Sequence, residues 1–88
     1  MSVHKGISNQ LNEKNREIKL FIQLDKEREA AIAHAVEQCE ANKSYTTERI
    51  NELSLQINEL AKQGSIPTRT YVTTKMVEEF VEKKRNNN

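Results

Sequence analysis

The sequence predicts an all-α protein, and three observations lead to this fold class. The chain has 88 residues but only two glycines and one proline that could interrupt a helix. Its apolar residues recur at spacings of three and four, and not in the alternating runs that strands show. Charged residues make up 31% and the hydrophobic set 35% of the chain, which leaves a thin core for a globular domain. We therefore expect one helical domain over residues 1–88.

The first predicted helix covers about residues 3–41. Its apolar residues and one cysteine follow a slowly drifting face, namely Ile7, Leu11, Ile18, Ile22, Ile32, Val36 and Cys39. A face that drifts in this way is typical of an antiparallel hairpin, a bundle or a coiled coil. Asn15, Asp25 and Glu29 interrupt it. We expect them to stay hydrated where a partner helix is absent; the alternative is that Asn15 fixes the register of a dimer.

Apolar side chains surround this helix between residues 18 and 24. Ile18, Phe21 and Ile22 share the main face, and Leu20 and Leu24 point elsewhere. Because one partner helix covers only one face, this apolar ring needs cover from two directions. We therefore take all five residues as candidate interaction residues.

The second predicted helix covers about residues 46–63. Its single apolar seam consists of Ile50, Leu53, Ile57 and Leu60, and Gly64 ends it. Thr46 is the expected N-cap, and Tyr45 is expected to pack on Ile50. The alternative is one continuous helix, because the seam keeps its phase back to Ile32. We expect a hairpin, since residues 42–47 read Asn-Lys-Ser-Tyr-Thr-Thr, a poor helix interior in which Asn42 tolerates a left-handed conformation.

A loop over residues 64–72 and a short helix over about residues 73–85 complete the predicted fold. A threonine before Lys75 is the expected cap, with Val72 packing on Val77. Four apolar residues share one face of this helix: Met76, Val77, Phe80 and Val81. Three cations suit the dipole at its C-terminal end: Lys83, Lys84 and Arg85. We expect residues 86–88 to be frayed.

The helix lengths predict a homodimer. The first helix spans about 55–60 Å and the second about 26 Å, so the second covers only the C-terminal half of the first. We expect the connection around Pro67 and the last helix to cover part of the apolar ring. The remainder, around Ile7, Leu11 and Leu20, is expected to be hidden by a second copy of the chain.

The sequence argues against an enzyme, a metal site and a cofactor. His4, His34 and Cys39 are the soft metal ligands, and the spacing of His34 and Cys39 places them on different helix faces. No glycine-rich phosphate loop or nucleophile elbow is present. Cys39 is the sole cysteine, so no intramolecular disulfide forms, and we expect it to be a small buried hydrophobe.

Nucleic-acid binding is the alternative function and is disfavoured. The net charge is +1, and the connection between the second and third helices is too long for a helix-turn-helix. No apolar run of signal-peptide or membrane-spanning length is present. We therefore expect a soluble cytoplasmic protein that does not enter membranes.

The loop offers two further candidate interaction residues, Arg69 and Tyr71. Loops on a rigid scaffold often carry function, and exposed Arg69 and Tyr71 would then bind an unidentified protein partner. The alternative, which we expect, is that Ile66 and Tyr71 plug the open end of the hairpin.

The run from Gly64 to Thr73 reads Gly-Ser-Ile-Pro-Thr-Arg-Thr-Tyr-Val-Thr, on a small Lys/Glu-rich helical chain that opens Met-Ser-Val-His-Lys. This chain resembles, over essentially its whole length, a family of uncharacterised small proteins of Bacillus-type Gram-positive bacteria. The resemblance implies a cytoplasmic bacterial protein and assigns no functional residues. The expected function is a structural or protein-interaction helical module that self-associates.

Overall fold

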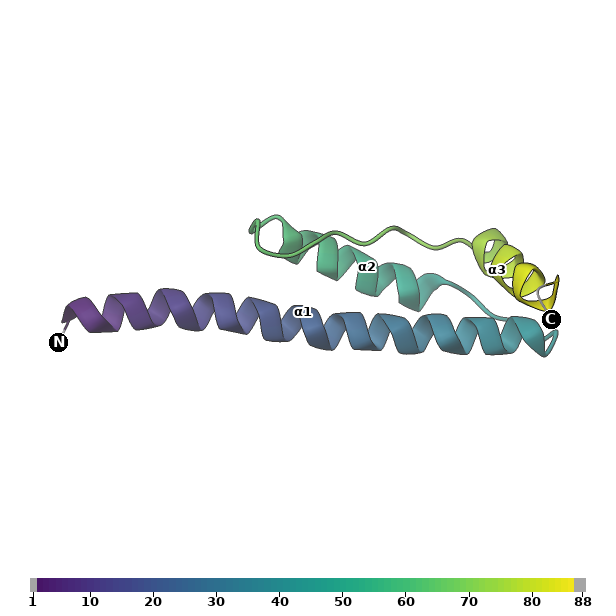
Figure 1. Cartoon of the computed structure of the whole chain (residues 1–88), viewed down its shortest axis with the longest axis horizontal. Helices are drawn as coiled ribbons and strands as arrows, with labels where there is room; N and C mark the ends of the chain where they lie inside the picture. The colour runs from purple at the N-terminus through teal and green to yellow at the C-terminus, as the bar shows by residue number, and fades with distance from the viewer. Residues whose placement is uncertain (1, 87–88) are drawn as a thin grey trace.

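The computed structural model describes the backbone over residues 2–86 and the side chains over residues 14–86. Within that range the chain is all-α, with α1 over Ser2–Glu40, α2 over Glu48–Ala61 and α3 over Thr74–Asn86. Figure 1 shows α2 folding back along α1, after which an extended segment runs back over α2 and carries α3 to the C-terminal end of α1. The predicted hairpin with a third helix is confirmed, and the single continuous helix is wrong.

The molecule is a rod with a thicker C-terminal half. It measures 61 × 24 × 17 Å, and its radius of gyration is 17.8 Å, against about 12 Å for a globular chain of this length. The rod follows from α1, whose 39 residues extend well beyond the 14 residues of α2 (Figure 1). The N-terminal end of α1 therefore has no neighbouring helix among residues 2–86.

Asn42 ends α1 in a Schellman motif. Its φ is 58°, the left-handed conformation that asparagine tolerates better than most residues. The amide of Lys43 donates to the carbonyl of Gln38 at 2.9 Å, and the amide of Asn42 donates to the carbonyl of Cys39 at 3.0 Å. These two bonds satisfy carbonyls that the helix end would leave unpaired. The expected role of Asn42 is confirmed.

The start of α3 agrees with the prediction, and the start of α2 differs from it slightly. The N-cap residue of α2 is Thr47, whose side chain makes no cap hydrogen bond, while the Thr46 hydroxyl accepts from the Glu48 amide at 3.2 Å. The Thr73 hydroxyl accepts from the Met76 amide at 3.2 Å, the third residue of α3, which is the geometry of an N-cap. The cap on α3 is confirmed, and the cap on α2 is one residue later than expected.

Two apolar clusters make the core. The first contains Ala35, Ile50, Val72, Val77 and Val81, and the second contains Leu24, Leu53, Ile57 and Ile66. On α2, Ile50, Leu53 and Ile57 are at most 1% exposed, each stabilising the fold by about 1.5–3 kcal/mol. The predicted seam of α2 is therefore the centre of the core, with Leu60 half-buried at its end. Tyr45 packs against the cluster that holds Ile50, as expected.

The position of α3 corrects one expectation. The predicted cover for the apolar ring of residues 18–24 included α3, but α3 packs against the C-terminal end of α1 (Figure 1). The reason is the course of residues 65–73, which we call the return segment; it bends at residues 65–66 and has no helix or turn over residues 67–73. Seven extended residues span about 23 Å, slightly more than the roughly 21 Å of α2. The return segment therefore runs the full length of α2 and leaves α3 at the opposite end of the hairpin.

Candidate functional site

Two asparagine amides of α2 hold the return segment. The Asn51 side chain accepts from the Val72 amide at 2.7 Å and donates to the Val72 carbonyl at 2.9 Å. The Asn58 side chain makes the same pair of bonds to Arg69, at 2.7 and 3.0 Å. Each amide thus imitates the edge of a neighbouring β-strand, although no sheet forms here.

The spacing of the two asparagines matches the extended chain. Asn51 and Asn58 are seven residues apart on α2, which corresponds to a rise of about 10.5 Å. Val72 and Arg69 are three residues apart, which corresponds to about 10 Å of extended backbone. Because α2 and the return segment run antiparallel, Asn51 pairs with Val72 and Asn58 pairs with the earlier residue Arg69. This agreement fixes the register of the return segment on α2.

Arg28 joins α1, α2 and the return segment. Its Nε donates to the Ser54 hydroxyl at 2.8 Å, and its Nη2 donates to the Thr70 carbonyl at 2.8 Å. The Ser54 hydroxyl, which is fully buried, donates in turn to the Ile50 carbonyl at 2.9 Å. A buried hydroxyl without partners would destabilise the core, so Arg28 satisfies Ser54 and at the same time ties down the return segment.

Arg69 forms the main ion pair of the site. Its Nε and Nη2 donate to the two carboxylate oxygens of Asp25 at 2.9 and 3.3 Å. The guanidinium also lies 5.2 Å from the centre of the Phe21 ring, within cation–π range. The hydrogen bond from Arg69 is the main reason that the pKa of Asp25 lies below its usual value of 3.8. The expectation that Asp25 stays hydrated is wrong, because the return segment brings Arg69 to it.

Tyr45 ties the start of α3 to the turn before α2. Its hydroxyl donates to the Thr74 carbonyl at 3.2 Å. Burial raises the pKa of Tyr45 to about 12, and the neighbouring Cys39 side chain adds to this shift. The phenol is therefore a neutral hydrogen-bond donor at physiological pH.

The candidate residues on the apolar ring divide into covered and exposed ones. Leu24 is buried and Phe21 is half-buried, because the return segment and α2 cover them. Ile18, Leu20 and Ile22 remain exposed at 43%, 45% and 46%. The predicted cover from two directions is thus only partial within this chain. The side chains of Ile7, Leu11 and His4 lie outside the described residues.

The two candidate interaction residues of the loop, Arg69 and Tyr71, also differ in their exposure. Arg69 is half-buried between Asp25 and Phe21, while Tyr71 is 48% exposed. Ile66 is buried in the second core cluster. The expected plug at the open end of the hairpin is therefore made by Ile66, and Tyr71 does not take part in it.

Between α1 and α3 lies an open groove of about 390 Å³. Its apolar walls are formed by Ile32, Ala33, Val36 and Phe80, and its polar rim by Glu29, Glu40 and Lys84. Phe80 is 57% exposed although the sequence placed it on one face with Val77 and Val81, both of which are buried. Sequence reasoning missed this groove because it requires the position of α3.

The basic C-terminal end of α3 contacts α1. Lys84 Nζ lies 3.5 Å from a Glu40 carboxylate oxygen, and Arg85 Nη2 donates to the Glu40 carbonyl at 3.1 Å. These two cations are therefore engaged near the last turn of α1. Of the sequence's soft ligands, His34 is exposed and Cys39 half-buried, and among the described residues no three His, Cys, Asp or Glu side chains gather as for a metal ion.

None of the helices, as far as the structure describes them, is long and apolar enough to span a bilayer. No solved structure matches the chain. It is 46% identical over 79 residues to the uncharacterized protein YpbS of Bacillus subtilis (strain 168), an alignment that covers 90% of this chain and 93% of YpbS. The model of the family described as "Protein of unknown function (DUF2533)" matches residues 1–83, and the chain therefore belongs to the DUF2533 family.

Proposed function

We propose that this protein is a structural or protein-interaction helical module that self-associates. The observation that carries the proposal is the exposure of Ile18 and Ile22, at 43% and 46%, on the face of α1 that they share, while Leu20, at 45%, is exposed on another side of the helix. Burying the exposed half of such a side chain would contribute roughly 1 kcal/mol each. Large apolar side chains gathered on a surface are typical of interaction sites.

The part of α1 that precedes Phe21 gives a second reason to propose self-association. A helix in water without tertiary packing is only marginally stable, because its apolar face gains nothing from burial. In this chain α2 and the return segment pack on α1 from about Phe21 onward. Contact with another molecule would supply the missing burial for the N-terminal part.

Sedimentation equilibrium at tens of micromolar protein tests the proposal. We expect the mass of a dimer, and we expect Ile22→Gln to shift the sample toward monomer. Gln23→Ala is the matched control, since Gln23 is exposed and points about 100° away from Ile22 and further from Ile18. A wild-type protein that stays monomeric across this concentration range would exclude self-association as its function.

A further inference from the structure

The face of α1 that carries Ile18 and Ile22 also carries one wall of the groove beside α3. Ile18 and Ile22 are followed fourteen residues later by Ile32 and Val36. Fourteen residues are two heptads, over which a straight helix drifts by only about 40°. An exposed apolar patch and an apolar groove thus lie on one side of one helix, with their centres about 21 Å apart.

Resting on the self-association proposed above, we propose that the partner is a second, antiparallel copy of this chain. Ile18 and Ile22 of each copy fill the groove formed by Ile32, Val36 and Phe80 of the other. Because the patch and the groove share one face, an antiparallel pair brings them together twice, related by a two-fold axis near Glu27. Such an interface is closed and self-complementary, so it stops at the dimer.

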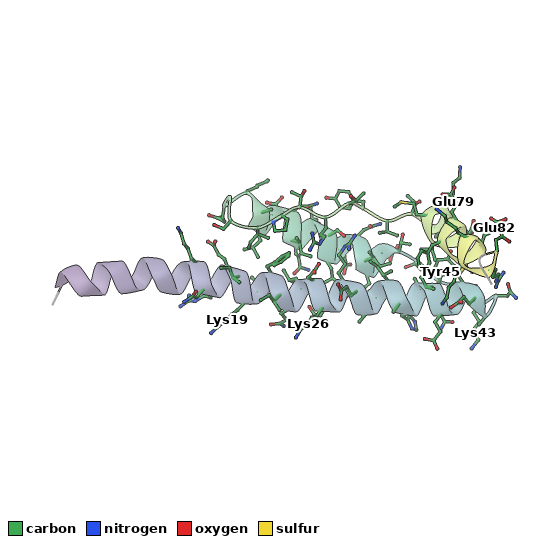
Figure 2. The ribbon with its side chains drawn as sticks, viewed as in Figure 1. Lys19, Lys26, Lys43, Tyr45, Glu79 and Glu82 are labelled. Atoms are coloured by element: carbon green, nitrogen blue, oxygen red, sulfur yellow. The ribbon has the colours of Figure 1, made fainter. Side chains whose placement is uncertain are left out.

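The charges of the two surfaces favour this orientation. The helix around the patch is basic, with Lys14, Arg16 and Lys19 opposed by Glu17. Figure 2 shows Lys19 on the side of α1 that is turned away from α2, where a partner can reach it. An antiparallel copy places these cations near the acidic groove, whereas a parallel copy places them against one another.

The groove has a carboxylate to receive these cations. With the axis near Glu27, Lys14 of one copy lies close to Glu40 at the groove rim of the other, and Lys84 balances Glu40 only in part. Asp25, between the patch and the groove, is already paired with Arg69, so it adds no unbalanced charge to the middle of the interface.

The apolar contacts of the groove are also incomplete within one chain. Phe80 is 57% exposed although its neighbours Val77 and Val81 are at most 3% exposed. An isoleucine from the partner would lie against this ring and against Ile32. The antiparallel pair therefore covers exposed Ile18 and Ile22 at one end of the hairpin and exposed Phe80 at the other.

Site-directed disulfide formation tests the arrangement. In a Cys39→Ser background, a chain with Ile22→Cys is mixed with a mass-tagged chain with Ala33→Cys, and the thiols are mildly oxidised. Ala33 is exposed at the groove, so its replacement leaves the core intact. We expect the mixed 22–33 disulfide to form faster than the 22–22 or the 33–33 disulfide. The matched control is His34→Cys, whose exposed side chain points about 100° away from Ala33 and should cross-link poorly to residue 22.

The outcomes separate this inference from the proposed function. Preferred 22–22 cross-linking, or a dimer by sedimentation that gives no 22–33 product, would overturn the antiparallel arrangement and leave self-association standing. A monomer by sedimentation would overturn both. As a second measurement, Phe80→Ala should weaken the dimer about tenfold or more without changing the unfolding curve at concentrations where the chain is monomeric. An unchanged dimer dissociation constant in this variant would also overturn the proposal.

Discussion

Asn51→Ala and Asn58→Ala are expected to loosen the return segment from α2. Each substitution removes two hydrogen bonds of 2.7–3.0 Å to the backbone of Val72 or Arg69. At about 1 kcal/mol per hydrogen bond the loss is about 2 kcal/mol, of which the better helix propensity of alanine returns roughly 0.5 kcal/mol. We therefore expect each variant to be destabilised by about 1.5 kcal/mol, a fall in Tm of roughly 6–12 °C for a chain of this size.

Thermal unfolding by circular dichroism, at one fixed protein concentration, measures this effect. The fixed concentration matters because association would raise the Tm. Gln56→Ala is the matched control, since Gln56 is exposed on the same helix and should change the Tm by little. If the return segment is released as a unit, the double asparagine variant should lose less stability than the sum of the losses in the two single variants.

Amide hydrogen exchange gives a sharper test of the same reasoning. The amides of Arg69 and Val72 donate to the two asparagine side chains, whereas no group among the described residues accepts a hydrogen bond from the Thr70 amide. We expect slow exchange at Arg69 and Val72 and fast exchange at Thr70. Equal rates at the three positions, or an unchanged Tm in both asparagine variants, would refute the role assigned to the amides.

Three further predictions follow from single side chains. The lowered pKa of Asp25 means that its pairing with Arg69 stabilises the fold above about pH 4 and is lost as the pH falls through that lowered pKa. The stability difference between wild type and Asp25→Asn in urea should therefore shrink from pH 6 to pH 3, and a constant difference would contradict this. Gly64→Ala should lower the free energy of unfolding by about 1 kcal/mol, because a φ of 90° strains a residue with a Cβ. No clash adds to this strain, since nothing lies within 4 Å of an added Cβ. A urea midpoint equal to that of the control Ser65→Ala would argue against backbone strain. Tyr71→Ala should change the free energy of unfolding by less than about 0.5 kcal/mol because the side chain is 48% exposed, and unfolding of this variant would instead favour a structural plug.

Local signals were enough to predict the helices and their ends. The positive φ of Asn42 and Gly64 and the cap of α3 by Thr73 were predictable, because such preferences depend on a few neighbouring residues. The seam of Ile50, Leu53 and Ile57 likewise became the centre of the core, since one apolar stripe on a helix has to be buried.

The resemblance to uncharacterised small proteins of Bacillus-type bacteria was also drawn from the sequence, and the match to the DUF2533 family model and to YpbS confirms it. The short-range chemistry of the chain and its similarity to relatives thus required no coordinates.

Only the tertiary structure decided the path of the return segment and everything that depends on it. Nothing in the sequence distinguishes Asn51 and Asn58 from other polar residues of a helix, and Asp25 was expected to be a hydrated interruption of the apolar face. Their partners lie between 11 and 44 residues away in the sequence. An asparagine or aspartate can pair with almost any donor, so its partner is not encoded locally. The same segment determines where α3 lies, and therefore which apolar side chains remain exposed for another molecule.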